Sequence, residues 1–276
     1  MANDSHQDLT TVEALVEAGL KPGQPVILDV RWQVGGPSLR QDYLTTHLPG
    51  AQWCDLDADL ADPPGGGGRH PLPDPARLQS ALRRWGIDAD SEVVIYDGGP
   101  SIAAARAWWV LRWAGLEHVR VLDGGFAAWL AAGLPTQSVV VVPTPGAVIV
   151  RPGSLPSLSA EQAGRWAEAG RLVDVRAPER FPGEVEPMDP VAGRIPGALN
   201  VPTTGNIDAD GRFLPQPELR DRFAGLTEQP VGVYCGSGVT AAHTMLAMRL
   251  AGVEAVLYPG SWSEWITDQQ RPVATG

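Results

Sequence analysis

The feature of this sequence that most restricts its fold is an internal repeat, in which four motifs of the first half recur in order in the second half. The matched pairs are residues 27–31 with 171–176, 47–51 with 194–198, 95–98 with 233–236 and 121–129 with 256–265. A collinear series of matches predicts two copies of one fold rather than one large domain.

The length and composition agree with two domains. The chain has 276 residues, of which 43% are hydrophobic, and ten tryptophans, enough for two separate cores. We divide it into a first domain over residues 8–135, a linker over residues 136–156 and a second domain over residues 157–276. The linker is proline-rich and carries a run of valines without a helical period.

Short apolar runs alternate with helical patterns in both halves. In the first half, strands are predicted at residues 25–30, 92–96 and 119–122, with helices at 103–115 and 126–132. Strands separated by helices of this length form parallel sheets that are covered on both faces. The fold class is therefore α/β, with two tandem domains, each a parallel sheet flanked by helices.

The stretch over residues 231–245 has the pattern of a reactive site. Residues 231–234 predict a buried strand that ends at Cys235, followed by the loop Gly-Ser-Gly and a helix from Thr240. Glycines let a backbone curl around a sulfur, and the helix N-terminus adds a partial positive charge. Such a cup favours a thiolate or an anion. A buried structural cysteine remains an alternative at this point.

The two copies differ at this position. The first copy has Asp97 where the second has Cys235, and its loop is Gly-Gly-Pro-Ser over residues 98–101. An ionised aspartate is no thiol nucleophile, and it would repel an anion. We therefore expect a catalytically silent first domain and a catalytic second domain.

Charge and cysteine content exclude several classes of function. The formal net charge of −11 argues against a nucleic-acid partner. No run approaches the ~20 apolar residues of a membrane span, and the N-terminus has no signal-peptide pattern. Cys54 and Cys235 are the only cysteines, and we expect free thiols in a cytoplasmic protein. No metal site or cofactor is predicted.

Taken together, the motifs resemble those of the two-domain rhodanese-type sulfurtransferases. The resemblance rests on Asp-Val-Arg, on Ile-Pro-Gly-Ala-Leu-Asn-Val-Pro at 195–202, on Tyr-Cys-Gly-Ser-Gly-Val-Thr at 234–240 and on Gly-Ser-Trp-Ser-Glu-Trp at 260–265. It covers roughly residues 9–273. The uncharged loop is similar to that of the mercaptopyruvate branch, since the thiosulfate branch carries basic residues there.

The resemblance implies a covalent mechanism. Cys235 would take a sulfane sulfur from an anionic donor, 3-mercaptopyruvate or thiosulfate, as a persulfide. The acceptor would be a small thiol, a thioredoxin-like protein or cyanide. Loop residues Gly236, Gly238, Val239 and Thr240 would hold the persulfide, although Thr240 is equally suited to cap the helix.

The resemblance also implies an arginine that anchors the donor, at Arg180. A guanidinium can hold a carboxylate through two hydrogen bonds, but an ion pair with Glu184 or Glu186 is the alternative. The mercaptopyruvate branch has a second arginine where this chain has Met188, so one carboxylate contact is missing. Arg194 replaces the usual histidine of the second Ile-Pro-Gly turn, and we expect it to supply part of the lost charge.

Ser237 and His47 match residues implied to form a proton relay with an acidic residue. The relay would activate the cysteine or protonate the leaving enolate. A histidine that precedes Leu-Pro-Gly is as well suited to cap a turn, so both readings of His47 stay open.

Two rival functions can be stated. A cysteine-dependent phosphatase needs an arginine six positions after the cysteine, and this chain has Ala241 there. A non-turnover sulfur carrier or regulatory persulfide module remains the alternative to an enzyme. Multiple turnovers in cyanolysis would indicate an enzyme, and one stoichiometric transfer would indicate a carrier.

Overall fold

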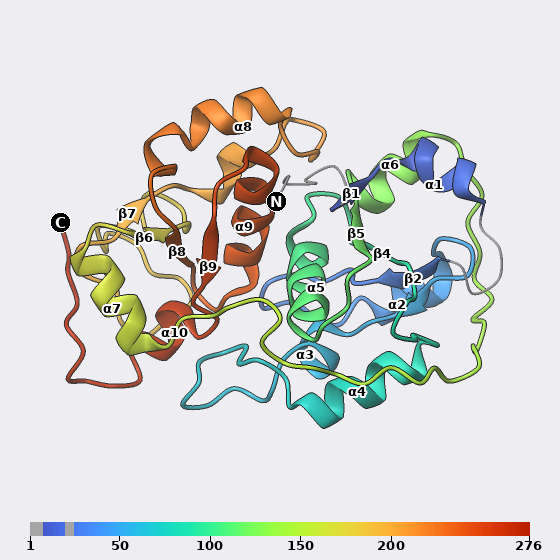
Figure 1. Ribbon diagram of the computed structural model, residues 1–276, viewed down its shortest axis with the longest axis horizontal. Coiled ribbons are helices and arrows are strands. Elements are labelled where there is room, and N and C mark those ends of the chain that lie inside the picture. Colours follow the sequence, from blue (N-terminus) through green and yellow to red (C-terminus); the bar gives the residue numbers. More distant parts are fainter. Residues whose placement is uncertain (1–7, 20–24) are drawn as a thin grey trace. The chain divides into compact units, whose positions relative to one another are not determined.

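The computed structural model describes residues 8–19 and 25–276, and it divides into two compact units (Figure 1). Unit 1 contains residues up to Ala61, Pro73–Leu155 and Ile207–Phe213, and unit 2 contains Asp62–Leu72, Pro156–Asn206 and Leu214–Gly276. Each unit therefore includes one short segment from the other half of the sequence. Residues 1–7, where no signal peptide is predicted, lie outside the described residues.

Unit 1 contains a parallel sheet whose strand order is β1-β5-β4-β2-β3. Its elements are β1 (Leu9–Thr10), α1 (Val12–Ala18), β2 (Val26–Asp29), α2 (Arg40–Thr45), β3 (Gln52–Trp53), α3 (Leu56–Asp59), α4 (Pro75–Arg84), β4 (Val93–Tyr96), α5 (Ile102–Trp113), β5 (Val119–Leu122) and α6 (Gly125–Ala131). Every residue of β2 and β4 is buried, as expected for strands covered on both faces.

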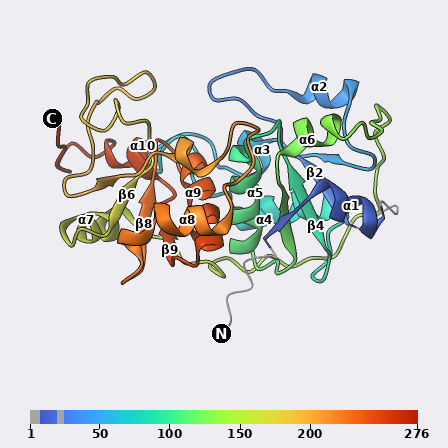
Figure 2. The ribbon, with the colours of Figure 1, turned by 90° about the horizontal axis from the view of Figure 1, so that it is seen from above.

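Helices cover both faces of this sheet. Helices α1 and α6 share a core cluster with alternate strand residues, among them Ile27, Val94 and Leu122. Helix α5 contacts β4 and β5, and Figure 2 shows α5 and α1 on opposite sides of the strands. Nearly all of α5 is buried, including Trp108 and Trp109, which explains why its sequence has no amphipathic pattern.

Unit 2 repeats this arrangement with the strand order β7-β6-β8-β9. Its elements are α7 (Ala160–Glu168), β6 (Leu172–Asp174), β7 (Leu199–Asn200), η2 (Thr203–Asn206), α8 (Gln216–Arg222), η3 (Ala224–Leu226), β8 (Val231–Tyr234), α9 (Val239–Ala251), β9 (Ala255–Leu257) and α10 (Ser261–Trp265). A parallel bridge between Ser157 and Leu257 continues the sheet beyond β9, where unit 1 has β1.

The two faces of this second sheet are also covered by helices. Helices α7 and α10 pack on one face around a cluster that includes Tyr234, Trp262 and Trp265. Helix α9 contacts β8 and β9 and carries α8 on its outer side (Figure 1). The strand order and layers confirm the predicted fold class, two α/β domains with parallel sheets.

A buried ion pair marks the same point in both units. After β2, Arg31 donates through Nε to Asp29 Oδ1 at 3.0 Å and through Nη2 to the Thr46 carbonyl at 2.7 Å. After β6, Arg176 donates through Nε to Asp174 Oδ1 at 3.0 Å and through Nη2 to the Gly193 carbonyl at 2.7 Å. The repeated Asp-Val-Arg motif therefore ties each strand to the turn that precedes the next one.

The proline-rich segment after unit 1's last helix is extended. Residues 138–151 contain no helix or strand, and several of their backbone groups bond to other parts of unit 1, to which they belong. The Gly146 N–H donates to the Arg83 carbonyl at 2.8 Å, and the Arg151 N–H donates to the Ala114 carbonyl at 2.8 Å. The valines at 139–142 remain exposed.

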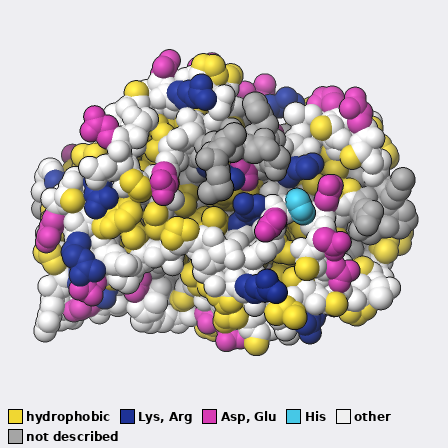
Figure 3. All heavy atoms as spheres, viewed as in Figure 1, with side chains coloured by type: hydrophobic (Ala, Val, Ile, Leu, Met, Phe, Trp, Pro, Cys, Tyr) yellow, Lys and Arg dark blue, Asp and Glu magenta, His cyan; other side chains and the backbone are white. Residues whose placement is uncertain are grey.

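The distribution of charged side chains and the length of the helices concern two partners considered from the sequence, nucleic acid and membrane. In the view of Figure 3, basic side chains lie scattered among acidic ones rather than gathered in one patch. Within residues 8–19 and 25–276, no helix combines the length and hydrophobicity needed to cross a membrane.

Candidate active site

Cys235 lies at the carboxyl end of β8, where unit 2 turns into α9. Its N–H donates to Ser261 Oγ at 3.1 Å, and its carbonyl accepts from the Trp262 N–H at 3.0 Å. The Gly236 carbonyl accepts from the Ser263 N–H at 2.8 Å. The first turn of α10 therefore fixes the backbone on both sides of a cysteine that is only 3% exposed.

Gly238 connects the loop to α9 and contacts the sulfur. Its φ is 79°, a left-handed conformation that glycine adopts without strain. Its N–H donates to Cys235 Sγ at 3.1 Å, and the helix begins at the next residue, Val239. Thr240 is therefore in the first turn, and the alternative reading of Thr240 as the helix cap is wrong.

The equivalent loop of unit 1 shows what such a cup binds. The carboxylate of Asp97 accepts hydrogen bonds from the N–H groups of Gly99, Ser101, Ala103 and Ala104, at 2.9 to 3.2 Å. Burial raises the pKa of Asp97, and these four hydrogen bonds oppose the rise. In unit 1 the cup therefore holds the chain's own carboxylate, whereas in unit 2 the same position carries a thiol.

Ser237 pairs with His70, a histidine for which the sequence predicts no role. His70 lies in the segment Asp62–Leu72, which belongs to unit 2, and its Nδ1 is 2.8 Å from Ser237 Oγ. The only local signal is its place beside a glycine run in a loop. The loop lies outside the four repeated motifs, so the repeat could not identify it.

His47, for which the sequence resemblance implies this role, is part of the unit 1 interior. Its side chain is fully buried, and its Nδ1 is 2.6 Å from the Tyr43 carbonyl. The ring stacks on Tyr43 with a centroid separation of 4.2 Å. The backbone of His47 also pairs with Gln137 through two 2.9 Å hydrogen bonds. These contacts fit the alternative reading, in which the histidine fixes a turn.

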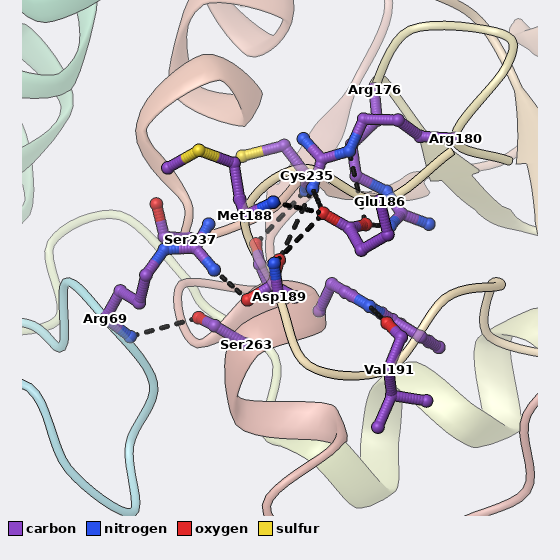
Figure 4. Close-up of polar contacts among 12 residues, drawn as sticks. Arg69, Arg176, Arg180, Glu186, Met188, Asp189, Val191, Cys235, Ser237 and Ser263 are labelled. Carbon is purple, nitrogen blue, oxygen red and sulfur yellow. Dashed lines mark hydrogen bonds and ion pairs between the residues drawn. The ribbon is translucent and has the colours of Figure 1, made fainter. Parts of the chain in front are cut away.

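Arg180 lies beside the loop and is paired with carboxylates. It donates to Glu186 through Nη2 at 2.6 Å and through Nε at 3.2 Å, and to Asp189 at 3.3 Å. Glu186 also accepts from Arg176, which is 3.3 Å away. Figure 4 shows this group next to Cys235. The ion pair foreseen with Glu186 therefore forms, and the arginine that it orients faces the cysteine loop.

The guanidinium of Arg69 is the second one that lies beside the cysteine loop. It forms an ion pair with Asp189, and the Arg69 N–H donates to Ser263 Oγ at 3.0 Å (Figure 4). A methyl group at Gly236 would lie 2.7 Å from Arg69 Nη2 and 3.8 Å from the Arg180 guanidinium. Two arginines therefore converge on Gly236, one of them supplied by the same segment as His70.

Gly236 is the position at which this convergence can be tested. Gly236→Ala would push the Arg69 guanidinium away. For the anionic sulfur donor that the sequence resemblance implies, we expect KM to rise about tenfold, as for the loss of one charge-assisted hydrogen bond. Gly98→Ala is the matched control, because a methyl group at this equivalent glycine of unit 1 meets nothing within 4 Å. Equal KM values for the two variants would contradict the placement of Arg69.

Arg194 is directed to the C-terminal segment. Its Nη1 donates to the Gly276 carbonyl at 2.9 Å and to the Phe181 carbonyl at 3.3 Å, and its guanidinium lies 4.5 Å from the centre of the Phe181 ring. Its backbone forms an antiparallel bridge with Ala274. Because the guanidinium of Arg194 is bound to the C-terminal segment and to Phe181, we do not include Arg194 in the donor site.

Comparison with known proteins adds a family. The sequence model described as "Rhodanese-like domain" matches residues 12–132 and again residues 159–268. Both matches carry one sheet each, so the internal repeat corresponds to two copies of this domain.

Full-length relatives have sulfur-transfer names. The chain is 48% identical to a "Probable 3-mercaptopyruvate sulfurtransferase" of Pseudomonas aeruginosa, over 99% of each chain. It is 47% identical to a "Putative thiosulfate sulfurtransferase SseB" of Mycobacterium tuberculosis, over 93% of each chain. The crystal structure of SseA from Escherichia coli, described among the "3-mercaptopyruvate sulfotransferases", matches with a TM-score of 0.81 at 33% identity. That match covers 93% of this chain and 99% of the other.

Proposed function

The chain belongs to the rhodanese family of sulfurtransferases, and we propose that it moves a sulfane sulfur from 3-mercaptopyruvate through a persulfide on Cys235. Thiosulfate is the second candidate donor, as the name of the Mycobacterium tuberculosis relative suggests. One observation carries the proposal: Cys235 Sγ accepts the Gly238 N–H in the cup whose copy in unit 1 holds a carboxylate. A cup that accepts an anion suits a thiolate and a persulfide.

With 3-mercaptopyruvate, the Cys235 thiolate attacks the donor's sulfur. A sulfur–sulfur bond forms, the donor's carbon–sulfur bond breaks, and its electron pair goes to the enolate of pyruvate. The proton that leaves the donor's sulfur ends on the methyl carbon of pyruvate, so the step needs a group that carries a proton. Splitting the transfer into two attacks at sulfur is the advantage of covalent catalysis.

We assign the transfer of this proton to Ser237 and His70. Their 2.8 Å contact lies within hydrogen-bond range, and Ser237 is two residues from the nucleophile. A serine and a histidine in contact can accept a proton from the donor's sulfur and return it to the enolate. His47 is left out, because its ring is buried in unit 1 with its Nδ1 on the Tyr43 carbonyl.

We assign the binding of the donor's carboxylate to Arg180 and Arg69. Both guanidinia lie within 4 Å of a methyl group placed on Gly236, the residue after the nucleophile. Arginine is suited to this role, since its planar fork can bind a carboxylate through two hydrogen bonds. Arg69 then supplies the positive charge that is missing at Met188.

The second half of the reaction returns Cys235 to the thiolate. A thiol acceptor, either a small thiol or a thioredoxin-like protein, or cyanide would attack the outer sulfur of the persulfide. We propose a reducing compartment such as the cytoplasm, which the two free cysteines support.

Intact-mass spectrometry tests this function directly. Incubation with 3-mercaptopyruvate or with thiosulfate is expected to add one sulfur atom to the protein, and later addition of cyanide is expected to remove it. Repeated thiocyanate formation with excess donor would mark an enzyme, and one equivalent per chain would mark a carrier. If neither donor adds sulfur, the proposed function is wrong.

A further inference from the structure

The arginines beside Cys235 are already matched by carboxylates. Arg69, Arg176 and Arg180 face Asp174, Glu186 and Asp189, so this group of three cations and three anions is formally neutral. The carboxylates of Glu186 and Asp189 are 4% and 3% exposed. An anionic donor that enters this site therefore meets no uncompensated positive charge among these six groups.

Asp189 differs from the other two carboxylates in what it bridges. Asp174 is tied to Arg176 behind the strand end, and Glu186 is shared between Arg176 and Arg180. Asp189 alone of the three joins Arg180 to Arg69, the two guanidinia that converge on Gly236. One of its oxygens faces each arginine, as the carboxylate of a bound α-keto acid would.

The loop that carries Asp189 is mostly outside the core. Val185, Met188 and Val191 are 48%, 39% and 38% exposed, whereas Asp189 turns inward (Figure 4). Asp189 is held by its N–H, which donates to Glu186 Oε1 at 3.1 Å, and by the two arginines. The contacts that keep Asp189 in place are thus polar, and a competing carboxylate can replace the ones to the arginines.

We propose that Asp189 is a specificity-determining residue, an internal carboxylate that occupies Arg69 and Arg180 until the carboxylate of the donor displaces it. This inference rests on the proposed function, because the ligand in question is the α-keto acid donor. Only a donor with a carboxylate placed to bridge both arginines recovers the two contacts that Asp189 gives up. Asp189 therefore weakens binding of every anion and selects for carboxylates of this shape.

Pyruvate, the product left by 3-mercaptopyruvate, is the probe that separates this inference from turnover. Its dissociation constant is measured calorimetrically for the wild type, for Asp189→Asn and for Glu184→Gln. Asp189→Asn keeps the shape and removes the competing charge, and we expect pyruvate to bind about tenfold more tightly. Glu184→Gln removes the same charge from an exposed position of the same loop, and we expect a change of less than about twofold.

The outcomes are distinct from those of the sulfur-transfer experiment. The role of Asp189 would be overturned if Asp189→Asn bound pyruvate no more tightly than the wild type does. It would also be overturned if neither protein bound pyruvate. If Glu184→Gln bound pyruvate as tightly as Asp189→Asn does, the gain in affinity would come from the lost negative charge in general. That result would overturn the specific role of Asp189. A second variant, Arg69→Gln, is expected to weaken pyruvate binding about tenfold, and an unchanged constant would also overturn the inference. Failure of the proposed function shows separately, as no mass gain with either donor.

Discussion

Cys235→Ser is expected to lower sulfur-transfer turnover by at least about 10⁴-fold and to abolish the one-sulfur mass gain. A serine hydroxyl at this position can still accept the Gly238 N–H, so the loop keeps its shape. The hydroxyl is a far weaker nucleophile than a thiolate at neutral pH, and it forms no persulfide. Turnover with cyanide as acceptor and intact mass after incubation with donor are the two measurements.

The second cysteine provides the control. Cys54 is fully buried in unit 1, and burial raises the pKa of its thiol well above the usual value. A buried thiol of this kind is inert, so Cys54→Ala should retain the mass gain and near-normal turnover. Sulfur on the Cys235→Ser protein would place the nucleophile elsewhere and refute the assignment.

The second large effect is expected at His70 and depends on the donor. With 3-mercaptopyruvate, a proton must move from sulfur to carbon, and His70→Gln should lower kcat about 100-fold. With thiosulfate, the leaving group is sulfite, which departs without a proton from the enzyme. The same variant should therefore keep most of its rate with thiosulfate. The ratio of the two rates, measured with one acceptor, is the readout.

His47→Gln separates this relay from a structural role. The His47 ring is fully buried and packs on Tyr43, so its replacement is expected to cost about 1–3 kcal/mol of unfolding free energy. Thermal unfolding measures that loss of stability. We expect the variant to keep the wild-type ratio of its rates with 3-mercaptopyruvate and with thiosulfate. If His47→Gln rather than His70→Gln lost 3-mercaptopyruvate turnover selectively, the assignment of the relay to His70 would have to be withdrawn.

The parts of the site that lie close together in the sequence are those that the sequence predicts best. The strand that ends at Cys235, the glycine loop and the helix beyond it follow from local rules of backbone freedom and apolar runs. The same rules apply at Asp97, which is why the repeat was visible. Local rules placed the helix start one residue late, because the left-handed Gly238 is the cap and not Thr240.

The contacts that distant segments make at the cysteine loop are those that the sequence does not predict. The sequence predicts roles for His47 and Arg194, which lie in repeated motifs, whereas the structure brings His70 and Arg69 to the loop. Both come from a segment that contains the glycine run 65–68. Such a segment has no period from which its partners can be read, and its contacts with Ser237, Ser263 and Asp189 are all long-range.

Two α/β domains and the family follow from the sequence alone, because strand and helix periods and short motifs are properties of neighbouring residues. That His70 reaches Ser237 and that Arg69 lies beside Gly236 is visible only in the folded structure. The same holds for the ion pair of Asp189 with Arg69. Those pairings join residues far apart in the chain. Their distances depend on how the segment Asp62–Leu72 folds onto unit 2, and no local pattern contains that information.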